Sequence, residues 1–134
     1  MRKIAILSML LFFVLSCVEK KQDNTISVIP EPMYSRADEG VFAIGKDTKI
    51  VLDDPSEEML RIAGFLNEKL SKAAGFELEV ISGGPVPKEN FIAFMNVGLP
   101  SENYEINVVP GNVLVDYGDG AGAFYALQTI LQLL

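Results

Sequence analysis

The stretch that decides the fold is VLVDYGDGAGAFYALQTILQLL, residues 113–134. An apolar strand, 113–117, meets a glycine-rich turn and then a run whose only polar side chains are Gln128, Thr129 and Gln132. Apolar side chains cover nearly the whole circumference of a helix with this sequence, which predicts a helix buried on every side. The run reaches Leu134 without a glycine or asparagine cap and without a basic residue in its last turn. We therefore expect the helix to lie against a further domain of a longer chain.

The apolar side chains of this helix fall into two sets. Residues three and four apart share a helix face, which groups Leu127, Ile130, Leu131 and Leu134. We assign that face to the domain's own sheet. Tyr125 and Leu133 then point elsewhere, and we assign them to packing between domains. Without a second domain they would form an exposed apolar patch of a kind that soluble monomers seldom carry.

The first residues have the pattern of an export signal. Two basic residues precede a twelve-residue apolar run, Ile4–Leu15, which is too short to cross a bilayer as a helix. Ser16-Cys17 follows it and is similar to the cleavage box of bacterial lipoproteins. We predict a lipoprotein signal over residues 1–17 with the lipid on Cys17, a polar tether over 18–25 and one domain over 26–134. The alternative is a plain signal peptide with an incidental thiol.

The net charge and the cysteine count exclude some classes of binding partner and an internal disulfide. Cleavage before Cys17 removes Arg2 and Lys3, two positive charges, and takes the net charge from −7 to −9. An acidic surface argues against nucleic acid and against an anionic membrane face, since both require clustered basic residues. Contact with a membrane is then expected only through the lipid anchor, in the periplasm or at the surface of a bacterial cell. The single cysteine excludes a disulfide within the chain.

The first half of the domain predicts three strands and a helix. Strands are expected at 26–29, 41–44 and 48–52, with the last two joined as a hairpin. An amphipathic helix is expected over 55–74, with Asp54 as N-cap, Pro55 at the first helical position and Glu57 completing a capping box. Gly75 is expected to end it.

The second half predicts four further strands before the last helix. They lie at 76–81, 91–95, 104–109 and 113–117. The strand at 91–95 is apolar on both faces, which suits a central position, and the last two form a hairpin through Pro110-Gly111. The expected fold class is α+β, an α/β sandwich in which a mixed or antiparallel sheet of about five to seven strands carries two helices on one face.

Side chains suited to catalysis are few. The chain contains no histidine, which excludes histidine-based nucleophile systems and imidazole-ligated metals. Helix capping accounts for the carboxylates at 53–54 and 57–58, and a solvated turn accounts for Asp38-Glu39. Asp116 and Asp119 lack the spacing of a calcium loop. We therefore expect no metal and no cofactor.

A glycine motif offers one rival interpretation. Gly118, Gly120 and Ala123 fit the dinucleotide fingerprint G-x-G-x-x-G/A. The fingerprint also requires a following parallel strand and an acidic residue about twenty positions on, and the sequence supplies neither. The favoured interpretation is a tight turn that brings helix and strand close together.

Three stretches resemble one known family. Residues 122–134, GAFYALQTILQLL, are similar to the helix that ends the non-catalytic N-terminal domain of family-20 glycoside hydrolases, the β-N-acetylhexosaminidases. Glu102–Ile106 resembles that domain's "EgY-x-l" strand entry, with Asn103 where glycine is usual. Val28–Pro32 resembles its opening "iiP-x-P". The resemblance covers residues 26–134.

The resemblance implies a domain packed against a (β/α)₈ barrel that carries the active site. In the family, an adjacent Asp-Glu pair of the barrel performs substrate-assisted hydrolysis of terminal N-acetylhexosamine residues. This sequence has no counterpart of that pair, because Asp38-Glu39 lies in a different context, and we assign no catalytic residue. The expected function is that of a structural domain of an exported β-N-acetylhexosaminidase, a fragment inactive alone, which meets a glycan only through the parent enzyme. The alternative is a free-standing lipoprotein that binds a glycan or a partner protein through the exposed face of the last helix.

Overall fold

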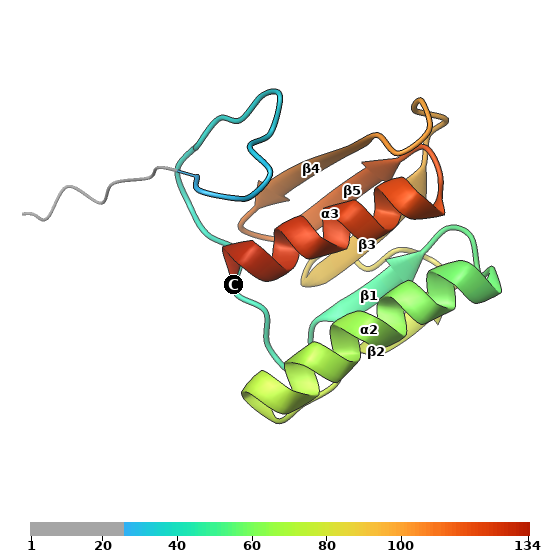
Figure 1. Ribbon diagram of the computed structural model, residues 1–134. Helices are drawn as coiled ribbons and strands as arrows, with labels where there is room; N and C mark the ends of the chain where they lie inside the picture. Colours follow the sequence, from blue (N-terminus) through green and yellow to red (C-terminus); the bar gives the residue numbers. More distant parts are fainter. Residues whose placement is uncertain (1–25) are drawn as a thin grey trace, which may run out of the picture.

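The computed structural model describes residues 26–134, in which five strands form one sheet and two helices pack beside it (Figure 1). The elements in chain order are β1 Lys49–Leu52, α2 Glu57–Ala74, β2 Glu79–Ser82, β3 Phe91–Asn96, β4 Tyr104–Val109, β5 Asn112–Tyr117 and α3 Gly120–Leu133. The strand order is β2-β1-β3-β5-β4. The expected α+β class with a mixed sheet is confirmed.

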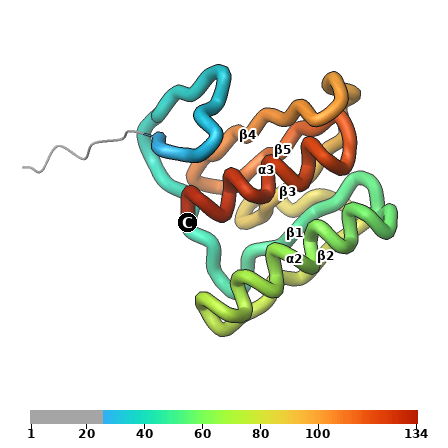
Figure 2. The backbone as a smooth tube through the Cα atoms, viewed as in Figure 1, coloured from blue at the N-terminus to red at the C-terminus, as the bar shows by residue number. Residues whose placement is uncertain are grey.

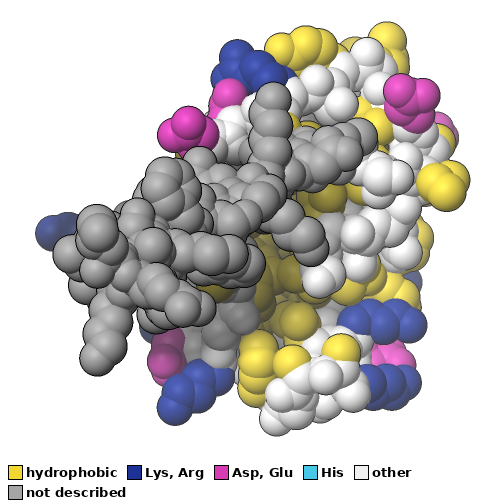
Figure 3. Space-filling model, turned by 90° about the vertical axis from the view of Figure 1, so that its left-hand side faces the viewer, with side chains coloured by type: hydrophobic (Ala, Val, Ile, Leu, Met, Phe, Trp, Pro, Cys, Tyr) yellow, Lys and Arg dark blue, Asp and Glu magenta, His cyan; other side chains and the backbone are white. Residues whose placement is uncertain are grey.

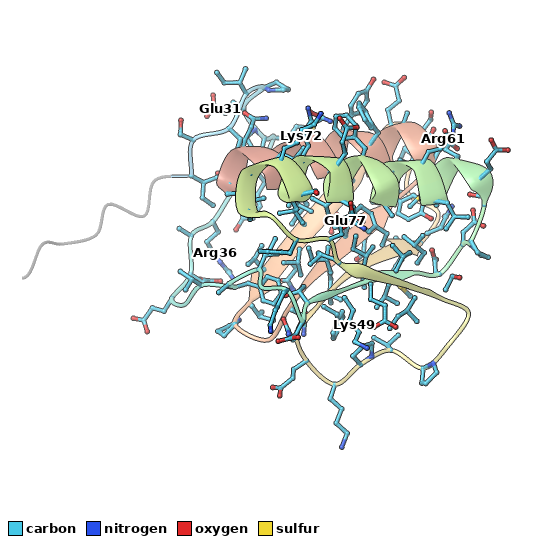
Figure 4. The ribbon with its side chains drawn as sticks, turned by 90° about the horizontal axis from the view of Figure 1, so that it is seen from below. Glu31, Arg36, Lys49, Arg61, Lys72 and Glu77 are labelled. Atoms are coloured by element: carbon cyan, nitrogen blue, oxygen red, sulfur yellow. The ribbon has the colours of Figure 1, made fainter. Side chains whose placement is uncertain are left out.

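The sheet is parallel except at one edge. Strands β2, β1, β3 and β5 run parallel, and β4 pairs with β5 as an antiparallel hairpin in which Val109 lies opposite Asn112. The chain leaves β1 through α2 to reach β2 and then returns past β1 to β3. The connection 83–90 makes this return on the side of the sheet away from the helices (Figure 4), as right-handed crossovers require.

Both helices lie on one face of the sheet, as expected (Figures 1 and 2). Between them and the sheet is the main core, whose buried members include Ile50, Leu52, Ile92, Phe94, Val115 and Tyr117 from the strands and Met59, Ile62, Leu66, Leu70, Leu127 and Ile130 from the helices. Each large side chain hidden from water contributes about 1.5–3 kcal/mol, so this layer dominates the stability of the fold.

The opposite face has a smaller apolar centre. Val51, Phe91 and Ala93 are buried there, with Met95 packed against them. Since Phe91 through Phe94 are all buried, β3 is covered on both faces, and its expected central position is confirmed. Lys49 lies on this side of the sheet (Figure 4) and pairs with Glu79 of β2 at 2.9 Å.

Helix α2 begins later than the sequence predicts. Its N-cap is Ser56, whose Oγ accepts from the Met59 amide at 3.3 Å. Asp54 instead accepts from the Ser56 amide at 3.0 Å, closing a side-chain turn ahead of the helix. The expected roles of Asp54 as N-cap, Pro55 as first helical residue and Glu57 as capping-box partner are therefore wrong.

The other end of α2 is as predicted. Gly75 adopts a left-handed conformation with φ of 78°, and its amide donates to the Ser71 carbonyl at 3.1 Å. Glycine adopts this conformation without the steric penalty of a side chain, so it ends the helix.

Three strand predictions need correction. Residues 26–29 and 41–44 are irregular, and no hairpin joins 41–44 to β1. The reason is topological, because β2 and β3 occupy both edges of β1 and leave no edge for a third partner. The strand expected at 76–81 begins only at Glu79. Leu78 before it is held by a side chain of α2, since Asn67 donates to its carbonyl at 2.9 Å and accepts from its amide at 2.8 Å.

Candidate functional site

The carboxyl ends of the parallel strands are where open α/β sheets bind ligands, and both helices begin at this edge. At this edge, carboxylates of the chain itself accept hydrogen bonds from backbone amides. Asp53 accepts from the amides of Asp54 at 2.7 Å and Asn96 at 2.6 Å, and from the Tyr117 hydroxyl at 3.2 Å. Burial, and then the charge of Asp53, raises the pKa of Tyr117, which keeps this hydroxyl a neutral donor.

Asp119 performs the same role at the start of α3. As N-cap it accepts from the Gly122 amide at 2.9 Å, and it also accepts from the Glu102 amide at 3.0 Å and the Ser101 hydroxyl at 2.6 Å. The hydrogen bond from Ser101, followed by those from the backbone amides, lowers the pKa of the Asp119 carboxyl. A negative side chain thus occupies the position at which a nucleotide phosphate would bind.

The glycine motif is explained by close approach of other backbone and side-chain atoms. A Cβ at Gly118 would overlap the carbonyl oxygens of Leu99 and Pro100. At Gly122 it would overlap the Asn103 carbonyl oxygen, and at Gly120 the Glu58 carboxylate. The favoured interpretation of the motif, a turn that brings helix and strand close together, is confirmed in this form.

No arrangement of catalytic groups is formed by the part of the chain that the structure describes. Asp38 pairs with Arg36 at 2.7 Å on the exposed surface, and Glu39 lies in the same exposed segment. No three His, Cys, Asp or Glu side chains of residues 26–134 gather as a metal site would require. Among these same residues, no helix combines the length and apolarity needed to cross a membrane.

The outer surface of the two helices carries a groove with partly exposed aromatic side chains. A groove of about 480 Å³ runs between α2 and α3. It is lined by Glu58, Arg61, Ile62, Phe65, Gly120, Ala121, Phe124 and Tyr125. The Phe65 and Phe124 rings lie 5.9 Å apart, and the Phe124 and Tyr125 rings 6.5 Å apart. Both spacings are those of interacting aromatic pairs.

Cations border this aromatic group. The Lys69 ammonium lies 4.8 Å from the centre of the Phe65 ring, within the range of a cation–π contact. Arg61 and Lys72 belong to the same helix (Figure 4). Glu58 and Arg61 line the groove together with Phe65, Phe124 and Tyr125, so charged and aromatic side chains lie side by side in it.

Helix α3 is covered on one side only, so the expectation of burial all round is not met in the described residues. Leu127 and Ile130 are buried and Leu131 is half-buried against the core, as the helix periodicity predicts. Leu134 was assigned to the same face, but it is the C-cap residue after the last helical position and is 66% exposed, so that assignment is wrong.

Tyr125 and Leu133 are 45% and 47% exposed. They point away from the sheet, and their packing against a second domain stays a prediction.

Phe65 and Phe124 belong to the same surface, but the sequence did not identify them as site residues. In the sequence, Phe65 is one of several apolar residues of an amphipathic helix. Only the packing of α2 against α3 places its ring beside that of Phe124, 59 positions away in the chain. Cys17 lies outside the described residues.

Fold and surface together define a mixed-sheet α/β domain in which Asp53 and Asp119 accept hydrogen bonds from the domain's own backbone and a partly apolar groove lies between the two helices. Residues 25–134 match the family described as glycosyl hydrolase family 20, domain 2, and the chain belongs to this family. A β-hexosaminidase of Porphyromonas gingivalis is 33% identical over 115 residues. That alignment covers 84% of this chain and 14% of the relative, so the chain spans about one seventh of the relative's length.

Solved structures have the same fold. The family-20 β-N-acetylhexosaminidase of Streptomyces coelicolor A3(2) is 27% identical, with a TM-score of 0.60 over 72% of this chain and 19% of its own. A family-20 exo-β-N-acetylglucosaminidase of Vibrio harveyi, solved with N-acetylglucosamine, has a TM-score of 0.65 at 20% identity, over 80% of this chain and 16% of its own. In both solved enzymes the matched region is less than one fifth of a longer chain.

Proposed function

We propose that this chain is the non-catalytic structural domain of an exported β-N-acetylhexosaminidase. The outer surface of α2 and α3 then packs against the catalytic barrel of the parent enzyme. The observation that carries the proposal is the aromatic group on α2 and α3, in which Phe124 and Tyr125 are 38% and 45% exposed and lie beside the partly buried Phe65. A patch of this kind is usually covered by a partner surface.

The parent enzyme would hydrolyse terminal N-acetylhexosamine residues with carboxylates of the barrel. This chain would stabilise and position the barrel without supplying a catalytic group, so it would be inactive without the barrel. Reading the DNA that follows codon 134 tests this directly. An open frame into barrel sequence supports the proposal, and a stop codon at that point contradicts it.

Self-association of the chain gives an independent test. Tyr125 and Leu133 are about half exposed, so covering them contributes about half of the 1.5–3 kcal/mol of a fully buried side chain each. We expect the segment 18–134, which lacks the apolar run 4–15, to form dimers or larger species in sedimentation or to bind a hydrophobic dye. The double variant Tyr125→Ser, Leu133→Ser should sediment as a monomer.

The matched control is Val86→Ser, which removes a 50% exposed side chain from the connection on the opposite side of the sheet. It should behave as the unmodified chain does. A monomeric unmodified chain that binds no dye would contradict the proposed interdomain surface.

We further propose that residues 1–17 direct export and that Cys17 carries a lipid. The support is the short apolar run and the position of the only cysteine directly after it. Metabolic labelling with a fatty acid should mark the wild-type chain and leave Cys17→Ser unlabelled. Equal labelling of the two would rule out the lipid on this residue.

A free-standing binding module is the second candidate. It is favoured by the groove itself, where aromatic rings stand beside the charged side chains of Glu58 and Arg61. Under this hypothesis, N-acetylglucosamine oligomers should shift the amide resonances of the groove, and Tyr125→Ser should abolish the shifts. Absence of shifts at millimolar oligomer would leave the structural role as the proposed function.

A further inference from the structure

One segment of the domain belongs to neither the sheet nor the helices. Residues 28–44, which we call the strap, run from the end of α3 to the start of β1 (Figures 1 and 2). Figure 3 views the molecule from this side, where exposed hydrophobic side chains are visible among charged groups. Within residues 26–134, no backbone–backbone hydrogen bond joins the strap to the rest of the domain. Its attachment therefore depends on side chains.

The first end of the strap is fastened by the side chain of Gln132. The Ile29 amide donates to Gln132 Oε1 at 2.8 Å, and Gln132 Nε2 donates to the Ile29 carbonyl at 3.0 Å. Because Ile29 is 83% exposed, water can replace both hydrogen bonds when they break, so this pair holds the segment weakly. Val28, directly before it, is 6% exposed, so its side chain reports whether this end is in place.

The chain is anchored differently at the other end of the strap. The Gly45 amide donates to Thr48 Oγ1 at 3.0 Å, and the Thr48 hydroxyl donates to Asn90 Oδ1 at 2.6 Å. Thr48 is completely buried, so breaking these hydrogen bonds would leave polar groups without a partner. The Asn90 amide in turn donates to the Gly111 carbonyl at 2.6 Å, which ties this end to the turn between β4 and β5. The anchor after the strap is therefore firm, and the one at its beginning is weak.

The middle of the strap packs loosely, and most of its side chains are exposed. A hollow of about 240 Å³ lies between residues 41–43 and the segments 89–90 and 110–111. Atoms that face such a hollow lack the dispersion contacts of a close-packed interior. Phe42 and Ile44 pack against the main core and are partly buried. Few contacts thus oppose the release of this segment.

We propose that the strap lifts from the domain as one unit while the sheet and both helices stay folded. Gln132 is the latch that holds its first end, and Gly45 is the hinge at which the lifted segment stays attached. A segment with few buried contacts and with exposed hydrogen bonds opens at a lower free energy than the core of its domain. The unequal strength of the two ends determines the direction, so the strap opens from Ile29 toward Gly45.

Opening of the strap changes the reach of the residues that precede it. Residues 30–44 can extend to about 50 Å, because each residue of an extended chain spans at most about 3.3–3.6 Å. The strap lies between Cys17, the proposed site of the lipid, and the sheet. The domain would thus move away from its anchor without unfolding. This gain in distance rests on the proposed lipid, whereas the opening itself depends on neither the lipid nor the parent enzyme.

A thiol at position 28 measures the opening. In a Cys17→Ser background, Val28→Cys reports the strap, and Val113→Cys, at a 4% exposed position of β5, reports the core. Both are labelled with a water-soluble maleimide in increasing urea, and each rate is divided by that of the unfolded chain. The rate follows the population of the open form when reclosing is fast. Val28→Cys should react about tenfold faster than Val113→Cys or more, and with a shallower dependence on urea, because less surface becomes exposed.

Two substitutions test the latch and the single unit, with the Val28→Cys thiol as reporter. Gln132→Ala should accelerate labelling about two- to fivefold, because its hydrogen bonds to the strap are exposed. Gln128→Ala on the same helix should leave the rate unchanged. Phe42→Ala should accelerate labelling about tenfold or more, because its packing is lost in the same opening. The matched control is Val41→Ala, which truncates the exposed neighbouring side chain and should have no effect.

Three results would overturn the inference. A urea dependence of Val28→Cys equal to that of Val113→Cys would mean that the strap leaves only when the whole domain unfolds. No effect of Phe42→Ala would mean that the first residues fray alone, and no effect of Gln132→Ala would exclude Gln132 as the latch. All of these rates are measured in the 134-residue chain, so they decide the opening separately from the proposed interface with the barrel.

Discussion

Asn67 and Gln132 make the same pair of hydrogen bonds in opposite environments, which permits a quantitative prediction. Each side-chain amide donates to the carbonyl and accepts from the amide of one residue, Leu78 for Asn67 and Ile29 for Gln132. Leu78 is 3% exposed and Ile29 is 83% exposed. Truncation to alanine removes this pair of hydrogen bonds in both cases, together with a longer one from Gln132 to the Gln128 carbonyl at 3.4 Å, but only the exposed Ile29 can replace its lost partners with water.

The different exposure of Leu78 and Ile29 determines how much stability each alanine variant is expected to lose. A buried backbone group left without a partner costs about 1–3 kcal/mol, so Asn67→Ala should lower the free energy of unfolding by about 2–4 kcal/mol. Gln132→Ala exposes its partner groups to water and should cost less than about 1 kcal/mol. Asn67→Ala should also loosen the entry to β2, since Leu78 directly precedes that strand.

Urea unfolding followed by circular dichroism measures both values. A single domain of this size is expected to unfold in one transition, so a change in midpoint at constant slope reports stability. Equal small losses for the two variants would refute the reasoning. They would mean that Leu78 reaches water or another partner as soon as the Asn67 side chain is removed.

Three other outcomes are expected. Gly118→Ala should lower the free energy of unfolding by about 1–3 kcal/mol in the same assay, because its methyl group would meet two backbone oxygens. Gly45→Ala, with nothing within 4 Å of the added atom, should have little effect. The pKa of Asp119 is lowered from the ordinary value of 3.8, so its contribution to stability is present above that value and is lost as the pH falls through the folded-state pKa. Asp119→Asn should accordingly show a flatter acid limb in unfolding measured against pH, and an unchanged limb would exclude the carboxylate as its cause. Finally, the purified chain should release no chromophore from a chromogenic N-acetylglucosaminide, and release proportional to chain concentration would contradict a non-catalytic domain.

Local patterns determined the elements that depend on neighbours in the chain. The face of α2 that carries Met59, Ile62 and Leu66 is buried as its three- and four-residue spacing predicts, and Gly75 ends the helix. The apolar runs at 91–95 and 113–117 likewise predicted the strands β3 and β5. These outcomes follow because burial of a helix face or strand face is set by residues a few positions apart.

Capping was harder to predict, because several polar residues compete for the same free amides. Asp54 and Ser56 both suit an N-cap, and the structure uses Ser56 because the two aspartates before it bind other backbone groups. From the sequence, Asp119 was considered only as a possible calcium ligand. Its cap of α3 could have been inferred from an aspartate directly before the helix, whereas its bonds to 101–102 could not.

The sequence by itself determined the fold class, the two helices, the central strand, the final hairpin and, through the resemblance of 122–134, the family. Tertiary structure alone decided that β1 lies between β2 and β3, so that 41–44 has no strand partner. It also decided that Phe65 meets Phe124 and that Gln132 holds Ile29. Each of these contacts joins residues from 30 to 103 positions apart in the chain. Such contacts are selected by the geometry of the assembled sheet and leave no period in the sequence, because nothing in the local chain distinguishes the chosen partner from the others of its type.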